Sequence, residues 1–288
     1  MVPGLPGHRQ PERHVERRCA TGDLASTADV WLRADLRSRA GDATRSDARA
    51  SPDRCHEQGG VSLPHPRQPP GASTVSSVAV AHEVAAMGGR SIACLNARDR
   101  NVLGFRRDLL TAAAYGVDTF LLVYGDRPSA GHSGSGELNV RRMMEEIRSF
   151  GAGPEFAGRP PFRIGVTSRL SAVPAFKREA DFLFAQMCFS CDAVLRWRER
   201  VAFDGPIYAG VMVLASGGMA RKLADTVTEI DIPAELVERV DRDHRAGVEL
   251  ACEQVEVLRD SEAFDGVHLV PVSRYREVAA RLEASEFS

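Results

Sequence analysis

The 288-residue chain lacks several features that mark particular classes of protein. Its longest apolar runs, residues 120–124 and 211–215, are far short of the ~18 residues that a membrane-spanning helix needs. The 37 basic and 39 acidic residues give a net charge of −2, so no basic field is available to hold nucleic acid. The amino terminus also lacks the apolar segment of a secretion signal. These absences predict a cytoplasmic protein that binds neither nucleic acid nor a membrane.

The sequence also lacks the short motifs of common catalytic and metal sites. HExxH, GxSxG and the dinucleotide-binding turn GxGxxG are all absent. Cys188 and Cys191 form a CxxC pair, but no second pair accompanies it as a structural zinc site requires. We therefore expect reduced, buried thiols at these two positions, no metal site, and no hydrolase activity.

Residues 1–72 differ in composition from the rest of the chain. They contain no Ile, Phe, Tyr, Lys or Asn, and Trp31 is their only aromatic residue. Strands and cores are rich in β-branched and aromatic side chains, so we expect a low-complexity, mostly disordered extension. An aberrant segment is the alternative, because GC-rich DNA read out of frame yields this composition. A short helix over residues 28–39 is the one element expected here.

Residues 73–288 alternate short apolar runs with amphipathic stretches, which is typical of β/α units around a parallel sheet. A helix with Phe105, Leu109, Ala112 and Tyr115 on one face is expected to end at Gly116. A second helix is expected over 241–259. Six apolar runs predict buried strands: 91–95, 119–124, 162–166, 182–184, 207–214 and 267–272.

Six such repeats predict an α/β fold of the TIM type, a (β/α)8 barrel that is incomplete at its amino terminus. A doubly wound sheet is the alternative, although no strand is followed by a dinucleotide-type turn. An incomplete barrel exposes strand edges that favour pairing, so self-association into a homo-oligomer, or instability, is expected if residues 1–72 supply no substitute strand.

The active site of a β/α barrel is formed by polar residues just past the carboxyl ends of its strands. Asp126 stands out among them because it follows an apolar strand and Gly125, where the backbone can approach a ligand closely. A helix cap or a turn is the alternative role for this aspartate. The polar residues at these positions are Asn96, Arg98, Asp99, Asp126, Ser168, Arg169, Gln186, Ser216, Ser273 and Arg274.

Two further features of these strand ends allow more than one interpretation. The amide of Gln186 both donates and accepts hydrogen bonds, which suits a heterocycle, but it could equally satisfy loop backbone. Residues 131–137, GHSGSGE, could offer backbone N–H groups to a phosphate, although a flexible loop is the default interpretation.

The chain resembles the methylenetetrahydrofolate reductase family over about residues 74–284. The resemblance implies a β/α barrel that binds FAD at the carboxyl face and uses NADH or NADPH to reduce 5,10-methylenetetrahydrofolate to 5-methyltetrahydrofolate. It thus implies a role in one-carbon metabolism. The matching stretches occur in the family's order: SSVAVAHEVAAMGG, CLNARDRN, DLLTAAAYGVDTFLLVYGDRP, FAQMCF, AGVMVLAS, GVELACEQVEVL and GVHLVPVSR.

The resemblance implies catalytic and substrate-binding roles for three residues. Asp126 corresponds to the aspartate beside flavin and pterin, whose charge stabilises a developing iminium cation. Gln186 corresponds to the residue that hydrogen-bonds the pterin. Arg274 would face the folate, where its guanidinium suits a carboxylate.

The resemblance also implies a cofactor-binding set that departs from the family's pattern. Tyr124 and Gly125 would line the flavin together with Asp126. Cys94 stands where the family's HLT motif has histidine, Asn96 where that motif has threonine, and Arg169 within the stretch that corresponds to YPExH.

The first strand of the family carries a glutamate that acts as general acid on the folate, and nothing in residues 1–72 reproduces it. Two functions therefore stay open. One is the flavin-dependent reductase. The other is a catalytically impaired folate-binding relative or a partner subunit of a methyl-transfer system.

Overall fold

The computed structural model describes residues 31–35, 59–60, 75–125, 134–227 and 230–286. Its centre is a curled sheet in which β3 to β8 are six parallel strands in consecutive order. All six predicted strands are present, with ends shifted by a few residues. Their bounds are β3 (Ala93–Asn96), β4 (Thr119–Val123), β5 (Arg163–Ser168), β6 (Phe182–Met187), β7 (Ile207–Met212) and β8 (Gly266–Val270).

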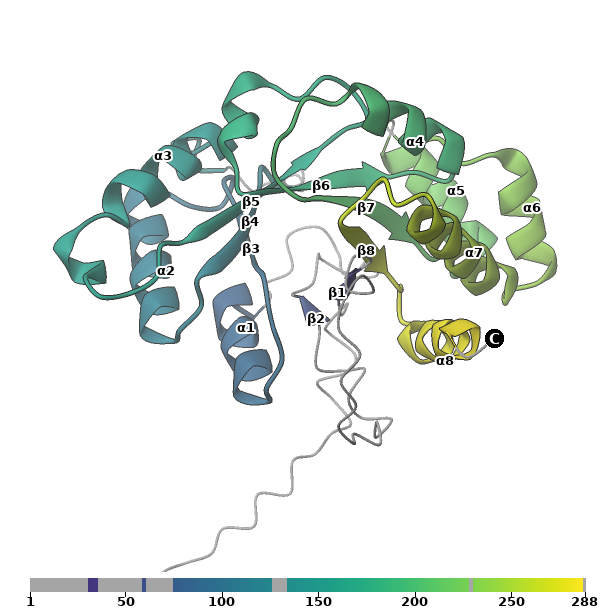
Figure 1. Cartoon of the computed structure of the whole chain (residues 1–288), viewed down its shortest axis with the longest axis horizontal. Coiled ribbons are helices and arrows are strands. Elements are labelled where there is room, and N and C mark those ends of the chain that lie inside the picture. The colour runs from purple at the N-terminus through teal and green to yellow at the C-terminus, as the bar shows by residue number, and fades with distance from the viewer. Residues whose placement is uncertain (1–30, 36–58, 61–74, 126–133, 228–229, 287–288) are drawn as a thin grey trace, which may run out of the picture.

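Helices that connect the strands cover the convex face of the curled sheet (Figure 1). One layer of helices outside a curved parallel sheet distinguishes an incomplete TIM-type barrel from a doubly wound sheet, so the predicted fold class is confirmed. In the described segments, no helix is long and apolar enough to cross a membrane. The helices are α1 (Ser77–Ala86), α2 (Val102–Ala114), α3 (Val140–Phe150), α4 (Cys191–Arg200), α5 (Gly217–Thr226), α6 (Ala234–Arg242), α7 (Ala246–Asp260) and α8 (Tyr275–Glu286), with short 3-10 helices η3 (Pro154–Phe156) and η4 (Ala175–Glu179).

The strands are apolar on both faces because both faces are covered. On β4, Phe120 and Leu122 belong to the large core beneath the outer helices, whereas Leu121 belongs to a second cluster on the inner face. Phe184 and Tyr208 lie in the same inner cluster, with ring centroids 5.3 Å apart at 78°. Two-sided burial explains why these strands have no polar alternation.

Local polar groups set the helix starts and stops. The side chain of Asn101 accepts a hydrogen bond from the backbone N–H of Gly104 at 2.7 Å and so caps α2. As predicted, this helix ends before Gly116, whose φ of +71° suits glycine. Asn139, Ser190 and Ser216 cap α3, α4 and α5 in the same manner.

The helix predicted over 241–259 is confirmed from residue 246 onward as α7, but its start is wrong, because α6 ends at Arg242 and the chain breaks at residues 243–245. Asp243 is extended, with φ −139° and ψ 110°. Its side chain accepts a hydrogen bond from the N–H of Arg245 at 2.9 Å. This local bond competes with the helical ladder, and the periodic apolar stripe could not reveal it.

The helix predicted over 28–39 is also wrong. Residues Trp31–Asp35 form strand β1, which pairs antiparallel with β8 and also pairs with β2 (Gly59–Gly60). The edge of β8 offers unpaired backbone N–H and C=O groups, and pairing with them outweighs a weak local helical preference. The remaining predictions for residues 1–72 concern positions outside the described residues.

The amino-terminal end of α7 packs directly on the backbone after β7. A Cβ at Gly247 would overlap the carbonyl oxygen of Leu214, which is part of the buried backbone and cannot move aside cheaply. At Gly218, near the start of α5, a Cβ would meet nothing within 4 Å. The same substitution therefore has opposite consequences at the two helix starts.

We expect Gly247→Ala to destabilise the chain by about 2 kcal/mol or more through overpacking. Gly218→Ala should stabilise it by about 0.5–1 kcal/mol through helix propensity. Urea unfolding of the full chain, followed by circular dichroism, measures both. Equal effects of the two substitutions would contradict the close packing of α7 on Leu214.

Candidate functional site

The carboxyl ends of β3 to β8 meet at one edge of the half-barrel, because neighbouring strands are parallel. The predicted site residues Asn96, Arg169, Gln186 and Arg274 come from the ends of four different strands at this edge. Residues far apart in the sequence are thus placed at one face.

The ends of β3 and β4 remain paired beyond the strands and bring Asn96 beside Gly125. The N–H of Arg98 donates to the carbonyl of Tyr124 at 3.0 Å. Gly125 has φ +94°, and a Cβ there would lie 3.2 Å from the Cβ of Asn96. The Tyr124 side chain is 60% exposed at this edge. The predicted cofactor-binding residues Asn96, Tyr124 and Gly125 are therefore neighbours. A residue larger than glycine at position 125 would be strained and would crowd Asn96.

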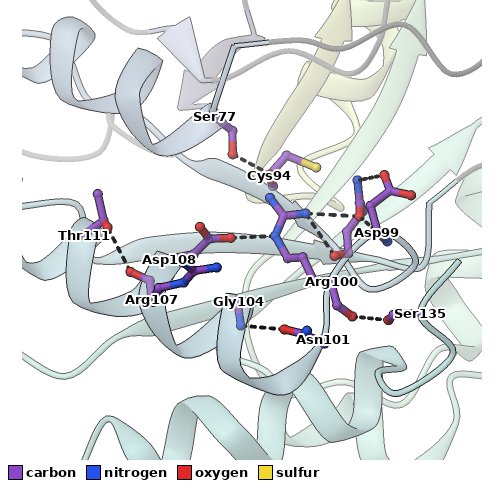
Figure 2. Close-up of polar contacts among 11 residues, drawn as sticks. Ser77, Cys94, Asp99, Arg100, Asn101, Gly104, Arg107, Asp108, Thr111 and Ser135 are labelled. Atoms are coloured by element: carbon purple, nitrogen blue, oxygen red, sulfur yellow. Dashed lines mark hydrogen bonds and ion pairs between the residues drawn. The ribbon is translucent and has the colours of Figure 1, made fainter.

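Cys94 precedes this group on β3. Its side chain is half-buried and lies on the same face of the strand as Asn96, since the intervening Leu95 belongs to the outer core. The hydroxyl of Ser77, at the start of α1, donates to the Cys94 carbonyl at 2.6 Å. Helix α1 thereby satisfies a carbonyl at the edge of β3 (Figure 2).

Asp126 lies outside the described residues, as does the first part of the glycine-rich stretch predicted as a phosphate loop. The N–H of Ser135 donates to the Arg98 carbonyl at 3.0 Å, and its hydroxyl donates to the Arg100 carbonyl. The carboxylate of Glu137 accepts from the N–H of Val102 at 3.0 Å. These bonds tie residues 134–137 to the β3–α2 loop and use donors that a phosphate would need.

At the end of β5, two cations lie close together. The amine of Lys177, on η4, donates to the carbonyl of Thr167 at 2.7 Å. Burial lowers the pKa of Lys177, and repulsion by Arg169 lowers it further. An anion bound beside the amine would favour its charged form and so oppose both effects. Ser168 is buried, and its hydroxyl donates to the Arg169 carbonyl at 3.0 Å.

Sequence reasoning missed Lys177 because it precedes β6 rather than following a strand. One signal could have found it. The chain has 37 basic residues but only two lysines, Lys177 and Lys222, so a lysine at the carboxyl edge is an exception that warranted attention.

Gln186 on β6 presents mainly donor groups. Its Oε1 accepts from the N–H of Met187 at 3.1 Å, which leaves the amide NH2 for other partners. Just beyond it, burial raises the pKa values of Cys188 and Cys191, so neither thiol is readily ionised. Both residues are half-buried, so the expectation of fully buried thiols is not met.

Two predicted positions serve local structure instead. Ser216 caps α5 by accepting from the N–H of Met219 at 3.1 Å. Val272 and Ser273 have φ values of +45° and +66° in a tight turn closed by the Arg274 N–H on the Pro271 carbonyl at 2.9 Å. The left-handed region is costly for a β-branched residue, so this turn stores strain at the mouth of the half-barrel.

Arg274 follows the strained turn and directly precedes α8. Its Nη1 donates to Oε1 of Glu277 at 2.7 Å, and the two side chains are 24% and 47% exposed. The guanidinium is thus paired with a carboxylate already, in an exposed contact that another carboxylate could replace at little cost.

A buried histidine, His268, lies on β8 and contacts the inner-face cluster of the sheet. Its ring stacks on Phe184 with centroids 4.7 Å apart at 23°. Complete burial lowers its pKa well below the usual value, so the folded chain holds it neutral.

Stability should therefore depend on pH through His268. Below about pH 6.5 His268 is protonated in the unfolded chain but stays neutral in the folded chain. The free energy of unfolding is therefore highest above that pH and decreases as the pH falls below it. Between pH 7 and pH 5 we expect a loss of about 2 kcal/mol that His268→Gln abolishes. Urea unfolding at both pH values measures it, with His244→Gln in the exposed α6–α7 loop as control. An unchanged pH dependence in His268→Gln would contradict this assignment.

In the part of the chain that the structure describes, no three His, Cys, Asp or Glu side chains gather as a metal site would require. Comparison with models of protein families matches residues 68–285, more than half of the chain, to methylenetetrahydrofolate reductase. A search of curated proteins found no match.

Proposed function

The chain belongs to the methylenetetrahydrofolate reductase family, and from this premise we propose that it reduces 5,10-methylenetetrahydrofolate to 5-methyltetrahydrofolate with NADH or NADPH through FAD. The observation that carries the proposal is the convergence of Asn96, Gly125, Lys177 and Gln186 at the carboxyl edge of the half-barrel.

The residues at this edge fit a flavin dinucleotide. A side chain at Gly125 would crowd Asn96, so glycine keeps this backbone close to the end of β3, and the exposed residue Tyr124 lies next to it. Lys177 and Arg169 provide paired positive charge that a pyrophosphate would neutralise. A planar ring and a diphosphate therefore both find suitable partners within one face.

FAD, when bound, supplies the two-electron carrier between the nicotinamide and the folate. The protein's own contribution is to orient the substrate and to stabilise charge. We assign Asp126 to the stabilisation of positive charge on the folate, since it follows Gly125 directly. The amide NH2 of Gln186 is assigned to an acceptor on the pterin.

Arg274 is assigned to the carboxylate end of the folate. Its Nη1 already donates to a carboxylate, that of Glu277, so the guanidinium lies where it can pair with such a group. Exchange of one exposed carboxylate for another changes the net energy little, so this contact contributes orientation more than affinity.

One structural observation favours the second function, a folate-binding relative or methyl-transfer partner subunit. In a closed barrel the first strand lies parallel to the last, but β1 is antiparallel to β8. Its final residue, Asp35, pairs with Gly266, the first residue of β8. The carboxyl end of β1 thus lies at the edge opposite the site, and it cannot deliver the family's glutamate there.

We expect the purified chain to bind FAD near 1:1, measured by flavin absorbance, and to oxidise NADH or NADPH when methylenetetrahydrofolate is present. Asp126→Asn should retain FAD and lower turnover by roughly 10²- to 10³-fold, because charge stabilisation is lost. Folate binding without FAD would favour the second function. No FAD binding at all would contradict the flavin-dependent reductase.

Lys177→Met should weaken FAD binding by roughly 10- to 100-fold, because a charge-assisted contact to phosphate is removed. Binding of riboflavin, which lacks phosphate, should be unchanged. Lys222→Met, on the exposed side of α5, is the matched control. Fluorescence titration measures the affinity of the unaltered chain and of both variants for FAD and for riboflavin. An equal loss of both affinities in Lys177→Met would show that Lys177 does not act on the phosphates.

A further inference from the structure

Arg100 lies at the centre of a polar network that joins the end of β3 to α2 (Figure 2). Its Nε donates to Oδ2 of Asp108 at 2.6 Å. Its Nη1 donates to both the backbone oxygen and Oδ1 of Asn96, each at 3.1 Å. Because Asp108 belongs to α2, the guanidinium is anchored to that helix while it holds the end of β3.

Asp99 binds both the oxygen and the nitrogen of the Asn96 side-chain amide. Its backbone N–H donates to Oδ1 of Asn96 at 3.3 Å, and Nδ2 of Asn96 donates to Oδ2 of Asp99 at 3.2 Å. Arg98 donates to both carboxylate oxygens of Asp99, at 2.7 and 3.1 Å. These bonds lower the pKa of Asp99, so its side chain stays a carboxylate that only accepts.

The chemistry of these partners determines which way the amide faces. A guanidinium and a backbone N–H can only donate, so the atom that faces Arg100 has to be oxygen. A carboxylate can only accept, so the atom that faces Asp99 has to be nitrogen. Of the two hydrogens on Nδ2 of Asn96, one is used by Asp99, and the described part of the chain provides no acceptor for the other.

We infer that Arg100 and Asp99 are positioning residues that hold Asn96 as a hydrogen-bond donor toward the ligand at the carboxyl edge. The inference rests on the proposed function for the identity of that ligand, a flavin. The flavin ring carries carbonyl oxygens and ring nitrogens that accept hydrogen bonds and only one N–H that donates. We call Arg100 and Asp99 the Asn96 clamp. Because the clamp fixes the Asn96 side chain as a donor, it favours the edge of the flavin ring that accepts hydrogen bonds.

FAD titration of variants tests the inference. Asn96→Ala should weaken binding by roughly 5- to 10-fold, the effect of one lost hydrogen bond. Asn96→Asp, which can only accept, should lose more. Arg100→Met frees the amide to rotate, so only a fraction of molecules present the donor and affinity falls roughly 3- to 10-fold.

The control is Arg106→Met, which breaks an ion pair of 2.9 Å between α2 and Glu146 without touching Asn96. It should leave FAD affinity within about twofold, because this pair contacts neither Asn96 nor Asp99. If Arg100 acts through Asn96, adding Arg100→Met to Asn96→Ala should cause no further loss. Additive losses in the double variant would overturn the positioning role.

A second readout needs no ligand. The chain has three asparagines, Asn96, Asn101 and Asn139, so side-chain ¹⁵N labelling of asparagine gives three NH2 signals. Arg100→Met should shift the Asn96 signal and leave that of Asn139, the cap of α3, in place. An unchanged Asn96 signal would overturn the clamp.

The two failures are distinguishable. If the unaltered chain binds no FAD, the proposed function fails and the flavin half of the inference is overturned with it, whereas the amide spectrum alone still decides the clamp. If FAD binds but Asn96→Asp binds it as tightly as the unaltered chain, the proposed cofactor stands and the donor assignment is overturned.

Discussion

Everything proposed for this chain depends on the parallel pairing of β3 to β8. Parallel strands carry all their carboxyl ends to one edge, so residues separated by up to 178 positions, such as Asn96 and Arg274, share a face of the molecule. The same pairing requires a crossover after each strand, and these crossovers form the helices of the convex face (Figure 1). Register and burial then fix which residues of each strand face inward. Asn96 faces inward because Leu95 and Ala97 are needed in the outer core.

The fold was predictable because its determinants are local and repetitive. Short runs that are apolar on both faces belong to strands with two covered faces, and the residues around Leu121 and Leu183 have that character. The two failures both concern competition that periodicity cannot register. At Asp243 a side-chain hydrogen bond interrupts an otherwise continuous apolar stripe. At residues 31–35 the open edge of β8 determines the structure, and a local helical pattern carries no information about that edge.

The candidate site was predictable in position but not in detail. The rule that polar residues follow barrel strands identified Asn96, Gly125 and Gln186, and the structure brings the first two into contact range. The rule could not tell that Ser216 caps a helix, because a cap and a ligand contact use the same hydroxyl. Nor could it find Lys177, on a 3-10 helix, or Arg100, within the β3–α2 loop, which hydrogen-bond to the ends of β5 and β3. Such residues are visible only when their partners are known.

The described side chains assigned to FAD, namely Asn96, Arg169 and Lys177, and the amide of Gln186 all offer hydrogen-bond donors. Asn96 has its oxygen occupied by Arg100 and Asp99, and Gln186 has its oxygen occupied by the N–H of Met187, so both amides offer NH2 groups. Lys177 and Arg169 can only donate. A ligand that satisfies this face needs acceptors along its length, as a flavin ring with its diphosphate has. Such a face can bind an electron-rich cofactor before any chemistry occurs, but it cannot stabilise positive charge on a substrate. Stabilising a positive charge requires a negatively charged group, and among the residues assigned to FAD or folate only Asp126 has one. The donors can therefore account for binding of the cofactor, whereas Asp126 accounts for turnover.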